Sequence, residues 1–454
     1  MGMARRNDRA LAEWVARRLQ GAGHEALFAG GCVRDRLRGV EPADHDIATS
    51  ARPEEVAALF PRTVPVGAAF GVMLVVEEAG EIEVATFRED LGIADGRHPA
   101  AVRYADARAD AARRDFTVNG MFEEPRSGAI LDFVGGREDL VRGLLRSIGD
   151  PRARFREDRL RLLRAVRFAT TLGFVIEPAT AAAIREAAPA IVEVSAERVR
   201  DELNRILISG RGGRGLGLLQ EFGLLAPILP EVAALDGVAQ GPQFHPEGDV
   251  FTHTRLLLDG YREGGLMVAL GALLHDIGKP GTARPEPDGN VAFPGHASLG
   301  AGMTDDVMRR LRYPSREIEQ VKALVEHHMD FPNVPKMREA KRRRFLLRED
   351  FPLHLELHRL DCLASHGKLD LHAYCGEARA RILAEPPPTL PLLDGEILKA
   401  LGFRPGPSFR TMLDDLMDAQ LEERVTNAEE ARAWVLARWV PPDGRRIAEE
   451  DPAS

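Results

Sequence analysis

Sequence patterns typical of β-strands are confined to the first 145 residues of this 454-residue chain. In that stretch a helix is predicted at residues 11–19, and three short apolar runs predict strands at residues 26–29, 72–76 and 82–86. From residue 150 onward helical spacing takes over, first at residues 154–172, 179–187, 196–208 and 215–222. The patterns predict a multi-domain α+β protein: a small N-terminal α/β sheet domain followed by all-α regions.

The length and the linkers predict how the chain is divided. A chain of 454 residues allows roughly three domains. A linker rich in Gly, Pro and Gln spans residues 235–249, and three consecutive prolines stand at 386–388. Helical patterns lie on both sides of the prolines, at 251–384 and 393–440. We therefore expect four parts, at residues 1–148, 149–235, 236–385 and 386–454.

Composition excludes several classes of protein. With 44% apolar and 29% charged residues, the chain is neither mainly disordered nor fibrous. Its 3 cysteines are too few and too scattered for a disulfide framework or a Cys-based zinc site, so a reducing cytoplasm is the expected location. No apolar run approaches the roughly 18 residues of a membrane span. The net charge of −9 argues only weakly against a nucleic-acid partner, because the distribution of charge matters more than the sum.

Two motifs in the N-terminal part indicate a phosphate and metal site. Gly30-Gly31 follows an expected strand and opens a helix, where a backbone can approach a phosphate, although a plain tight turn fits equally well. Asp44 and Asp46 are two residues apart, so on a strand both would point to one face. Paired carboxylates suit Mg²⁺ bound together with substrate phosphates, and solvated loop acids are the alternative. Glu83 either faces the same site or is an exposed strand residue.

A polar cluster at residues 113–119 adds groups that bind nucleotides. Its arginines can bind triphosphate oxygens, and its Asp and Asn can bind ribose hydroxyls; a surface ion-pair cluster is the alternative. Together with Gly30-Gly31, Asp44-x-Asp46 and residues 82–88, this cluster resembles the head domain of the class II tRNA nucleotidyltransferases. That family includes the CCA-adding enzymes and the bacterial poly(A) polymerases. The resemblance implies template-independent nucleotide addition to an RNA 3′ end.

The resemblance also implies roles for these residues. Asp44 and Asp46 would be the catalytic residues and would hold two Mg²⁺ ions. The incoming nucleotide would be bound by Gly30, Gly31, Arg34, Arg114, Asp115 and Asn119. One small departure is Gly120, where the family more often has alanine.

Base selection is expected downstream of the head. Glu157-Asp158-Arg159-Leu160-Arg161 is predicted to open a basic helix on which Asp158 and Arg161 share a face. In an arbitrary sequence such a pair is a solvated ion pair. Here it resembles the family's Glu-Asp-x-x-Arg element, which implies that Asp158 and Arg161 select CTP and ATP and that Glu157 orients them. Arg198, on a helix that Ser195 would cap, would support this pocket.

The implied partners are tRNA, CTP and ATP, with no membrane. Seven arginines between residues 152 and 167 would contact an RNA backbone, and a second basic run at 336–348 is more simply a solvated face. Residues 66–73 lack the basic stretch of the poly(A) polymerases, which favours transfer to tRNA. Residues 95–99 resemble an intact loop of the family, and this loop is typically degraded in the CC-adding members. We therefore expect CCA addition, with A-addition or poly(A) synthesis as the alternative.

A second constellation of histidines and aspartates lies between residues 251 and 367. Its order resembles the HD superfamily of metal-dependent phosphohydrolases, and imidazole with carboxylate suits Mn²⁺, Fe²⁺, Ni²⁺ or Zn²⁺. The resemblance implies ligands at His253, His275, Asp276, His296, His327 and Asp361, with His328 as the competing choice for His327. Lys279 would contact the phosphate of the substrate, a 2′,3′-cyclic or terminal phosphate that blocks an RNA 3′ end. A degenerate HD fold that only binds RNA is the alternative.

With these resemblances, the four parts become a nucleotidyltransferase head (1–148), a helical neck that selects nucleotides and binds RNA (149–235), an HD phosphohydrolase domain (236–385) and a helical tail (386–454).

Overall fold

The computed structural model describes residues 9–67, 70–92, 101–241, 245–262, 265–287, 290–384, 391–422 and 424–441. The chain divides into two compact units, each described by itself below. The first comprises residues 1–239, 249–269 and 306–314, and the second comprises residues 240–248, 270–305 and 315–454. None of the helices in the described ranges is both long and apolar enough to cross a membrane.

The first unit begins with a seven-stranded sheet in the order β3-β4-β5-β2-β1-β8-β9. Its strands are β1 (Ala26–Ala29), β2 (Asp46–Thr49), β3 (Thr63–Gly67), β4 (Val72–Glu77), β5 (Gly80–Thr86), β8 (Met121–Glu123) and β9 (Ile130–Asp132). The pair β2–β5 is parallel and the other pairs are antiparallel. The three strands expected from the sequence are confirmed as β1, β4 and β5.

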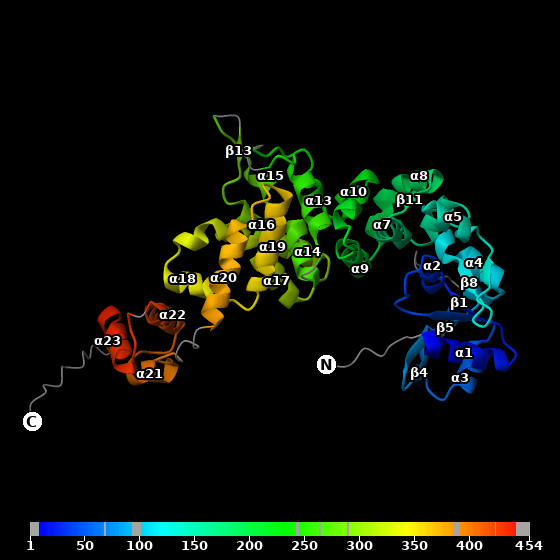
Figure 1. The fold of residues 1–454 in the computed structure, drawn as a ribbon, viewed down its shortest axis with the longest axis horizontal. Coiled ribbons are helices and arrows are strands. Elements are labelled where there is room, and N and C mark those ends of the chain that lie inside the picture. The colour runs from blue at the N-terminus through cyan, green and yellow to red at the C-terminus, as the bar shows by residue number, and fades with distance from the viewer. Residues whose placement is uncertain are drawn as a thin grey trace, which may run out of the picture. The chain divides into compact units, whose positions relative to one another are not determined.

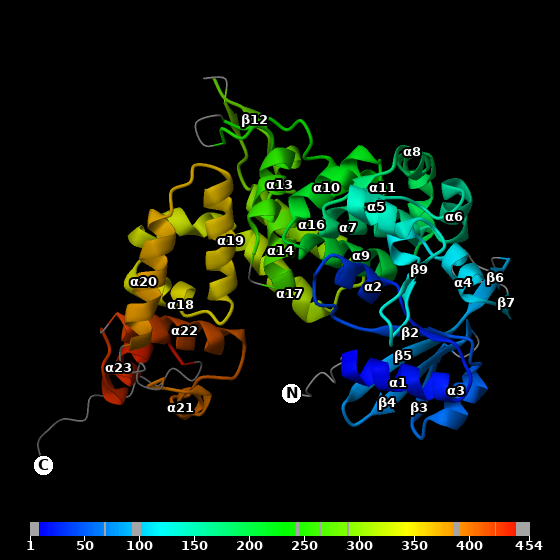
Figure 2. The same cartoon turned by 45° about the vertical axis from the view of Figure 1, so that its right-hand side comes forward.

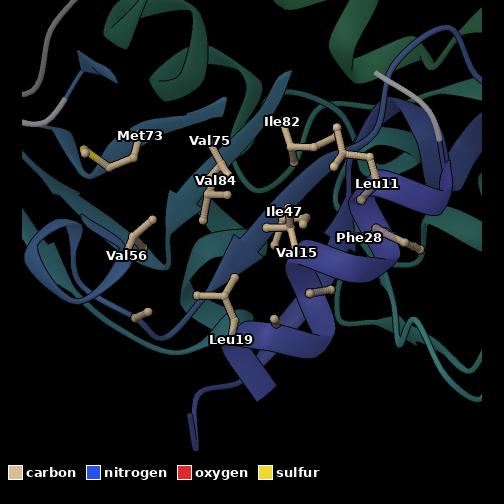
Figure 3. Packing of buried hydrophobic residues seen from close by; sticks show 14 of the residues in the cluster. Leu11, Val15, Leu19, Phe28, Ile47, Val56, Met73, Val75, Ile82 and Val84 are labelled. Atoms are coloured by element: carbon tan, nitrogen blue, oxygen red, sulfur yellow. The ribbon is translucent and has the colours of Figure 1, made fainter. Parts of the chain in front are cut away.

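Alternating side chains give this sheet two packed faces. On one face Phe28, Ile47 and Val84 pack against α1 (Arg9–Gly21), with α3 (Pro53–Leu59) beside it (Figures 2 and 3). On the other face Leu27 and Ala48 belong to a cluster with Ala107 and Ala111 of α4 (Ala107–Arg113). Since successive strand residues point to opposite faces, Asp46 and Glu83 lie on the face opposite α1.

The rest of the first unit is mainly helical. Its further elements are α2 (Gly31–Leu37), η2 (Thr117–Asn119), α5 (Gly136–Arg142), α6 (Pro151–Glu157), α7 (Leu160–Leu172), α8 (Pro178–Ala187), η3 (Ala188–Glu193), α9 (Ala196–Leu207), α10 (Gly212–Glu221), α11 (Leu225–Ile228), α12 (Pro230–Ala233) and α13 (Val250–Gly260). Two short strand pairs accompany them, β6 (Arg88–Leu91) with β7 (Ala101–Tyr104), and β10 (Leu144–Leu145) with β11 (Val175–Ile176). Residues 95–99 lie outside the described residues.

Glycines in α10 allow close helix packing in this unit. Helix α10 lies against α7, α9 and α13 (Figure 1). A Cβ at Gly213 would collide with the carbonyl oxygen of Arg255 on α13, and one at Gly215 would collide with Ile206 on α9. The backbones therefore approach more closely than any side chain would allow.

One sequence prediction in the neck is wrong. The expected single helix over 154–172 is interrupted between α6 and α7, where Asp158 is extended (φ −148°, ψ 108°). Its carboxylate accepts a hydrogen bond from the Leu160 amide (3.0 Å), a local bond that competes with continuing the helix. Asp158 and Arg161 therefore do not share one helical face. Ser195 precedes α9 as expected, but its side chain makes no capping hydrogen bond.

The described residues of the second unit are helical apart from one two-residue strand pair, β12 (Arg284–Pro285) with β13 (Val291–Ala292). Its helices are α15 (Lys279–Thr282), α17 (Ser315–His327), η4 (His328–Lys336), α18 (Glu339–Leu346), α19 (Phe351–Ala364), α20 (Asp370–Ala384), α21 (Gly395–Ala400), α22 (Pro407–Leu421) and α23 (Ala428–Arg438). Helices α14 (Gly265–Leu274) and α16 (His296–Arg310) belong partly to each unit. The last three helices enclose their own apolar cluster, which includes Leu398, Leu416 and Val435.

The second residue after the end of α16 offers a stability test. Among the described residues, Arg312 is the non-glycine residue with a positive φ, at 60°. The left-handed conformation suits glycine at a helix end. We therefore expect Arg312→Gly to raise the free energy of unfolding by about 0.5–1 kcal/mol, the net of relieved strain and the added entropy of the unfolded chain. Thermal or chemical denaturation measures this. Glu319→Gly within α17 is the control and should destabilise; a similar loss for Arg312→Gly would refute the argument.

Candidate functional sites

Three carboxylates gather at one end of strands β2 and β5. Asp46 is the first residue of β2, and the register pairs Ile47 with Val84, so Asp46 and Glu83 are neighbours across the parallel pair. Asp44 precedes the strand and is exposed, whereas Asp46 is partly buried. The expectation that both aspartates lie on one strand therefore fails for Asp44.

The electrostatics of this cluster show how close the three groups are. Burial, followed by the charges of Glu83 and Asp44, raises the pKa of Asp46 to about 7, while Arg114 acts in the opposite direction. Desolvation and the Asp44 carboxylate also raise the pKa of Glu83. Asp46 and Glu83 each have acidic neighbours that disfavour their charged form, and a divalent cation with oxygen ligands removes that repulsion. Carboxylate oxygens are the ligands that Mg²⁺ prefers.

The turn before α2 lies beside an arginine of the polar cluster. Gly30 has a φ of 75°, and a Cβ there would lie 3.1 Å from Nη1 of Arg114. Arg34 on α2 donates from Nη1 to Oδ1 of Asn119 (2.7 Å). Arg114 itself is held by Asp110 through its Nε (3.1 Å) and Nη2 (2.9 Å). The glycine turn, Arg34, Arg114 and Asn119 thus form one connected group, in which Arg34 and Asn119 are buried.

Asp115 is enclosed by protein donors. Its Oδ1 accepts from the Phe116 amide (2.8 Å) and from Nδ2 of Asn119 (3.1 Å), and its Oδ2 accepts from Nε (2.8 Å) and Nη2 (2.5 Å) of Arg164. Burial alone would raise the pKa of Asp115, but Arg164 and these hydrogen bonds lower it to about 2. Asp115 therefore fixes Asn119 and joins the head to α7. Sequence reasoning missed Arg164 as its partner, although Arg164 lies one helical turn after Arg161.

The base-selection candidates lie around the break between α6 and α7. Arg161 donates from Nη1 to Glu157 (2.6 Å), and Asp158 accepts from Nη2 of Arg198 (2.8 Å). Asp158 and Arg161 are thus each held by a neighbour, Arg198 and Glu157 respectively. All four side chains are partly exposed, which leaves edges free for a ligand.

The arginines of this stretch do not form a free basic stripe. Six of the seven pair with acidic side chains: Arg152 with Glu186, Arg154 and Arg161 with Glu157, Arg159 with Glu193, Arg164 with Asp115, and Arg167 with Glu202. Part of their charge is therefore neutralised within the protein.

Gly120 is required by its surroundings. A Cβ at this position would lie 2.8 Å from Cγ2 of Val134 and 3.0 Å from Cδ1 of Ile148. The side chains of Val134 and Ile148 fill the space that the methyl group of an alanine would take. Glycine at this position, where the family more often has alanine, therefore leaves the site intact.

The second site is a buried cluster in the second unit. Ligand atoms of Asp276, His296 and His328 all lie within 4.8 Å of one another. Nε2 of His275 lies 3.1 Å from Oδ2 of Asp276, and Nζ of Lys279 donates to the same oxygen (2.7 Å). Lys279, expected at the substrate phosphate, donates in addition to Oε1 of Gln240 (2.6 Å).

The histidine tautomers favour a metal ion in this cluster. Nδ1 of His275, His296 and His328 each faces a backbone carbonyl oxygen, at 3.0, 2.8 and 2.6 Å. Since a carbonyl only accepts, each Nδ1 carries the proton and each Nε2 keeps its lone pair. Burial lowers the pKa of His296 and, together with His275, lowers that of His328 to about 4. The Nε2 atoms of His296 and His328 face each other at 3.2 Å, which suits a shared cation.

The last expected histidine ligand needs a correction. His327 ends α17, and its Nδ1 pairs with Asp330 (2.9 Å) at the surface, whereas the buried His328 joins the cluster. Neighbouring residues on a helix point about 100° apart, so only one of the two can face the site. His253 is fully buried on α13 in the first unit. Asp361 lies on α19 and lines the same cavity as Asp276.

A cavity of about 740 Å³ opens over the cluster. At one end lie His275, Asp276, His296 and His328, and the remaining wall combines apolar residues with polar ones. The apolar wall comprises Val291, Ala292, Phe293, Met329, Pro332 and Leu371. A cavity of this size holds a small organic ligand beside the cluster.

A glycine contact supports the position of His296. A Cβ at Gly278 would collide with the carbonyl oxygen of His296 and lie 2.8 Å from the Gly300 amide nitrogen. We therefore expect Gly278→Ala to displace the start of α16, to lower stability by about 1–3 kcal/mol and to weaken metal binding. Metal content and melting temperature measure this. Gly302→Ala on the same helix is the control, because open space surrounds it and a helical Gly→Ala change stabilises; equal effects would contradict the packing argument.

Known families match three stretches of the chain. Residues 26–146 match the poly(A) polymerase head domain, residues 173–235 match the probable RNA- and SrmB-binding site of polymerase A, and residues 249–361 match the HD domain. Nucleotidyltransferase and HD domains generally use divalent metals, in agreement with the two donor sets.

Individual proteins match over nearly the whole chain. The sequence is 36% identical to an A-adding tRNA nucleotidyltransferase of Deinococcus radiodurans, over 94% of this chain and 97% of that protein. It is 36% identical to a CC-adding tRNA nucleotidyltransferase of Thermus thermophilus, over 91% and 93%. The fold is similar to that of the Bacillus stearothermophilus CCA-adding enzyme in complex with CTP, with a TM-score of 0.74, 28% identity, and coverage of 94% and 96%.

Proposed function

This chain belongs to the tRNA nucleotidyltransferase family, and from that premise we propose that it adds CCA to the 3′ end of tRNA from CTP and ATP. One observation carries the proposal: Asp46 lies among the charges of Asp44, Glu83 and Arg114, in the same unit as Asp158 and Arg161. The first unit would thereby combine the groups that bind phosphate, metal and base. Selection of the nucleotide by these groups requires no template strand. A tRNA substrate makes the cytoplasm the expected place of action.

The head would bind the metal and the triphosphate. Asp44 and Asp46, with Glu83 beside them, would hold Mg²⁺, which when bound supplies positive charge to the reacting phosphate and the RNA 3′-hydroxyl. The backbone of Gly30 and Gly31 would approach the phosphates, and Arg34 and Arg114 would neutralise them. Asn119 would bind the ribose, oriented by Asp115 through its hydrogen bond.

The neck would read the base. Asp158 offers carboxylate oxygens and Arg161 offers guanidinium donors, which together match the edge of cytosine or adenine. Arg198 and Glu157 would hold the two in place through the hydrogen bonds described above. Uracil and guanine present an acceptor and a donor in the reverse order along that edge, so a fixed order of Asp158 and Arg161 would disfavour UTP and GTP without a template.

Three tRNA transcripts test this function: one lacking CCA, one ending in C and one ending in CC. Each is incubated with Mg²⁺ and with CTP, ATP or both, and the products are sized at single-nucleotide resolution. CCA addition predicts C and CC products with CTP alone, A on the CC transcript with ATP, and three added residues with both. One A on the CC transcript only, CC only, or a long A tail would replace the proposal by A-addition, CC-addition or poly(A) synthesis.

We also propose a metal-dependent phosphohydrolase activity in the second unit, favoured by the facing Nε2 atoms of His296 and His328. His275, Asp276, His296, His328 and Asp361, with His253 from the sequence pattern, would hold Mn²⁺, Fe²⁺, Ni²⁺ or Zn²⁺. The substrate would be a 2′,3′-cyclic or terminal phosphate of RNA or of a nucleotide. Hydrolysis of 2′,3′-cyclic AMP after loading with each metal tests this; no hydrolysis with any of the four metals would favour an RNA-binding body.

The four-part division at residues 148, 235 and 385 also stays a proposal. The family matches support the first two boundaries, because they end at residues 146 and 235 and begin again at 249.

A further inference from the structure

Arg154 on α6 donates hydrogen bonds to both ends of its own helix and to the end of α4. Its Nε donates to the carbonyl oxygen of Ile148 (3.1 Å), before α6. Its Nη1 donates to both carboxylate oxygens of Glu157 (3.0 and 2.7 Å), at the end of α6. Its Nη2 donates to the carbonyl oxygen of Ala112 (2.5 Å), near the end of α4.

The Ala112 contact ties Arg154 to the nucleotide-binding cluster of the head. The last carbonyl groups of a helix have no partner within it and carry partial negative charge, so a guanidinium is a favourable partner. Arg161 makes a second contact of the same kind, from Nη2 to the carbonyl oxygen of Arg113 (3.4 Å). Arg114 and Asp115 follow directly in the chain, so the neck arginines hold the segment that carries them.

The Glu157 contact ties Arg154 to base selection. One carboxylate oxygen of Glu157 accepts both from Arg154 (2.7 Å) and from Arg161 (2.6 Å). Arg161 also donates to the carbonyl oxygen of Arg154 (3.2 Å). The position of the Arg161 guanidinium therefore depends on Arg154 through both its side chain and its backbone.

We propose that Arg154 is a positioning residue that fixes the base-selecting pair relative to the triphosphate site of the head. The inference rests on the proposed nucleotidyltransferase function. Each of the three guanidinium nitrogens donates to a protein acceptor, so Arg154 acts through Glu157 and α4 and not by contact with the nucleotide. The guanidinium carries its donors on three separate nitrogens in one plane, whereas the ammonium group of lysine carries all of its donors on one nitrogen.

Steady-state kinetics with each of the four nucleoside triphosphates test this proposal. In Arg154→Ala, the preference for CTP and ATP over UTP and GTP should fall about ten- to hundred-fold, because a small displacement of a contact group has large effects on productive binding. The loss should lie mainly in KM for CTP and ATP, because Asp44 and Asp46 are untouched. Arg154→Lys should restore the preference only in part, since a single ammonium cannot reach all three acceptors.

The matched control is Arg142→Ala, which removes an ion pair with Glu138 (2.7 Å) on the surface of a helix. This variant should leave the preference for CTP and ATP unchanged. An equal loss of kcat/KM for all four nucleotides, with the preference intact, would overturn the proposal. Full rescue by Arg154→Lys would overturn the three-way contact. An inactive wild-type chain would instead refute the nucleotidyltransferase function, so the two failures are distinguishable.

Discussion

Replacing Asp46 with asparagine should reduce nucleotide addition to tRNA by at least about a thousand-fold, which corresponds to about 4 kcal/mol of lost transition-state stabilisation. The amide has nearly the same shape as the carboxylate but carries no charge, so the variant should fold and yet bind Mg²⁺ poorly. The raised pKa of Asp46, caused by burial and by Glu83 and Asp44, indicates a site that favours a cation over three free charges. Primer-extension kinetics on a CC-ending tRNA measure the loss.

A thermal shift distinguishes lost metal binding from misfolding. Mg²⁺ should raise the melting temperature of the wild-type chain and have a smaller effect on Asp46→Asn. The control is Glu54→Gln on α3, an exposed carboxylate on the opposite face of the sheet, which should keep full activity. Activity of Asp46→Asn within about ten-fold of wild type would remove Asp46 from the catalytic assignment.

His328→Gln should abolish metal binding and phosphohydrolase activity in the second unit, whereas His327→Gln should leave both nearly unchanged. His328 is buried and its Nε2 faces His296 at 3.2 Å, but His327 pairs with Asp330 at the surface. Removal of a residue that hydrogen-bonds to a metal ligand typically weakens metal affinity ten- to hundred-fold. Removal of a direct ligand such as His328 should weaken it by more. Metal content after loading with Mn²⁺ and desalting measures binding, and hydrolysis of 2′,3′-cyclic AMP measures activity.

Both histidine variants should add nucleotides to tRNA at the wild-type rate, which serves as the folding control. The opposite result, with loss of metal in His327→Gln and retention in His328→Gln, would restore the alternative alignment of the HD pattern. Loss of metal in both variants would mean that either substitution disturbs the end of α17 as a whole.

Local patterns predicted the elements whose side chains repeat with a clear period. Strands β1, β4 and β5 and helices α8 and α9 follow directly from apolar spacing, because burial of one face fixes both the period and the register. The acidic motif Asp44-x-Asp46 was also recognisable, and Glu83 joins it because β2 and β5 pair in parallel. That pairing is between segments far apart in the chain, so the sequence left the role of Glu83 open.

The features that sequence analysis missed depend on tertiary contacts or on a change of register. The break at Asp158 depends on one side-chain bond to Leu160, which competes with a helical pattern that otherwise continues. Arg154 and Arg164 looked like members of a basic surface because their partners, Ala112 and Asp115, belong to the head. The choice between His327 and His328 depends on where α17 ends, and helix ends are uncertain by one or two residues from sequence.

The most direct test of the central claim is to offer a tRNA transcript lacking its CCA end all four nucleoside triphosphates together with Mg²⁺, and then to sequence the new 3′ ends. Protein-based selection by Asp158 and Arg161 predicts that nearly every extended molecule ends in CCA and stops there. Ends of mixed sequence, runs of a single nucleotide, or no extension at all would contradict the claim that this chain is a CCA-adding enzyme.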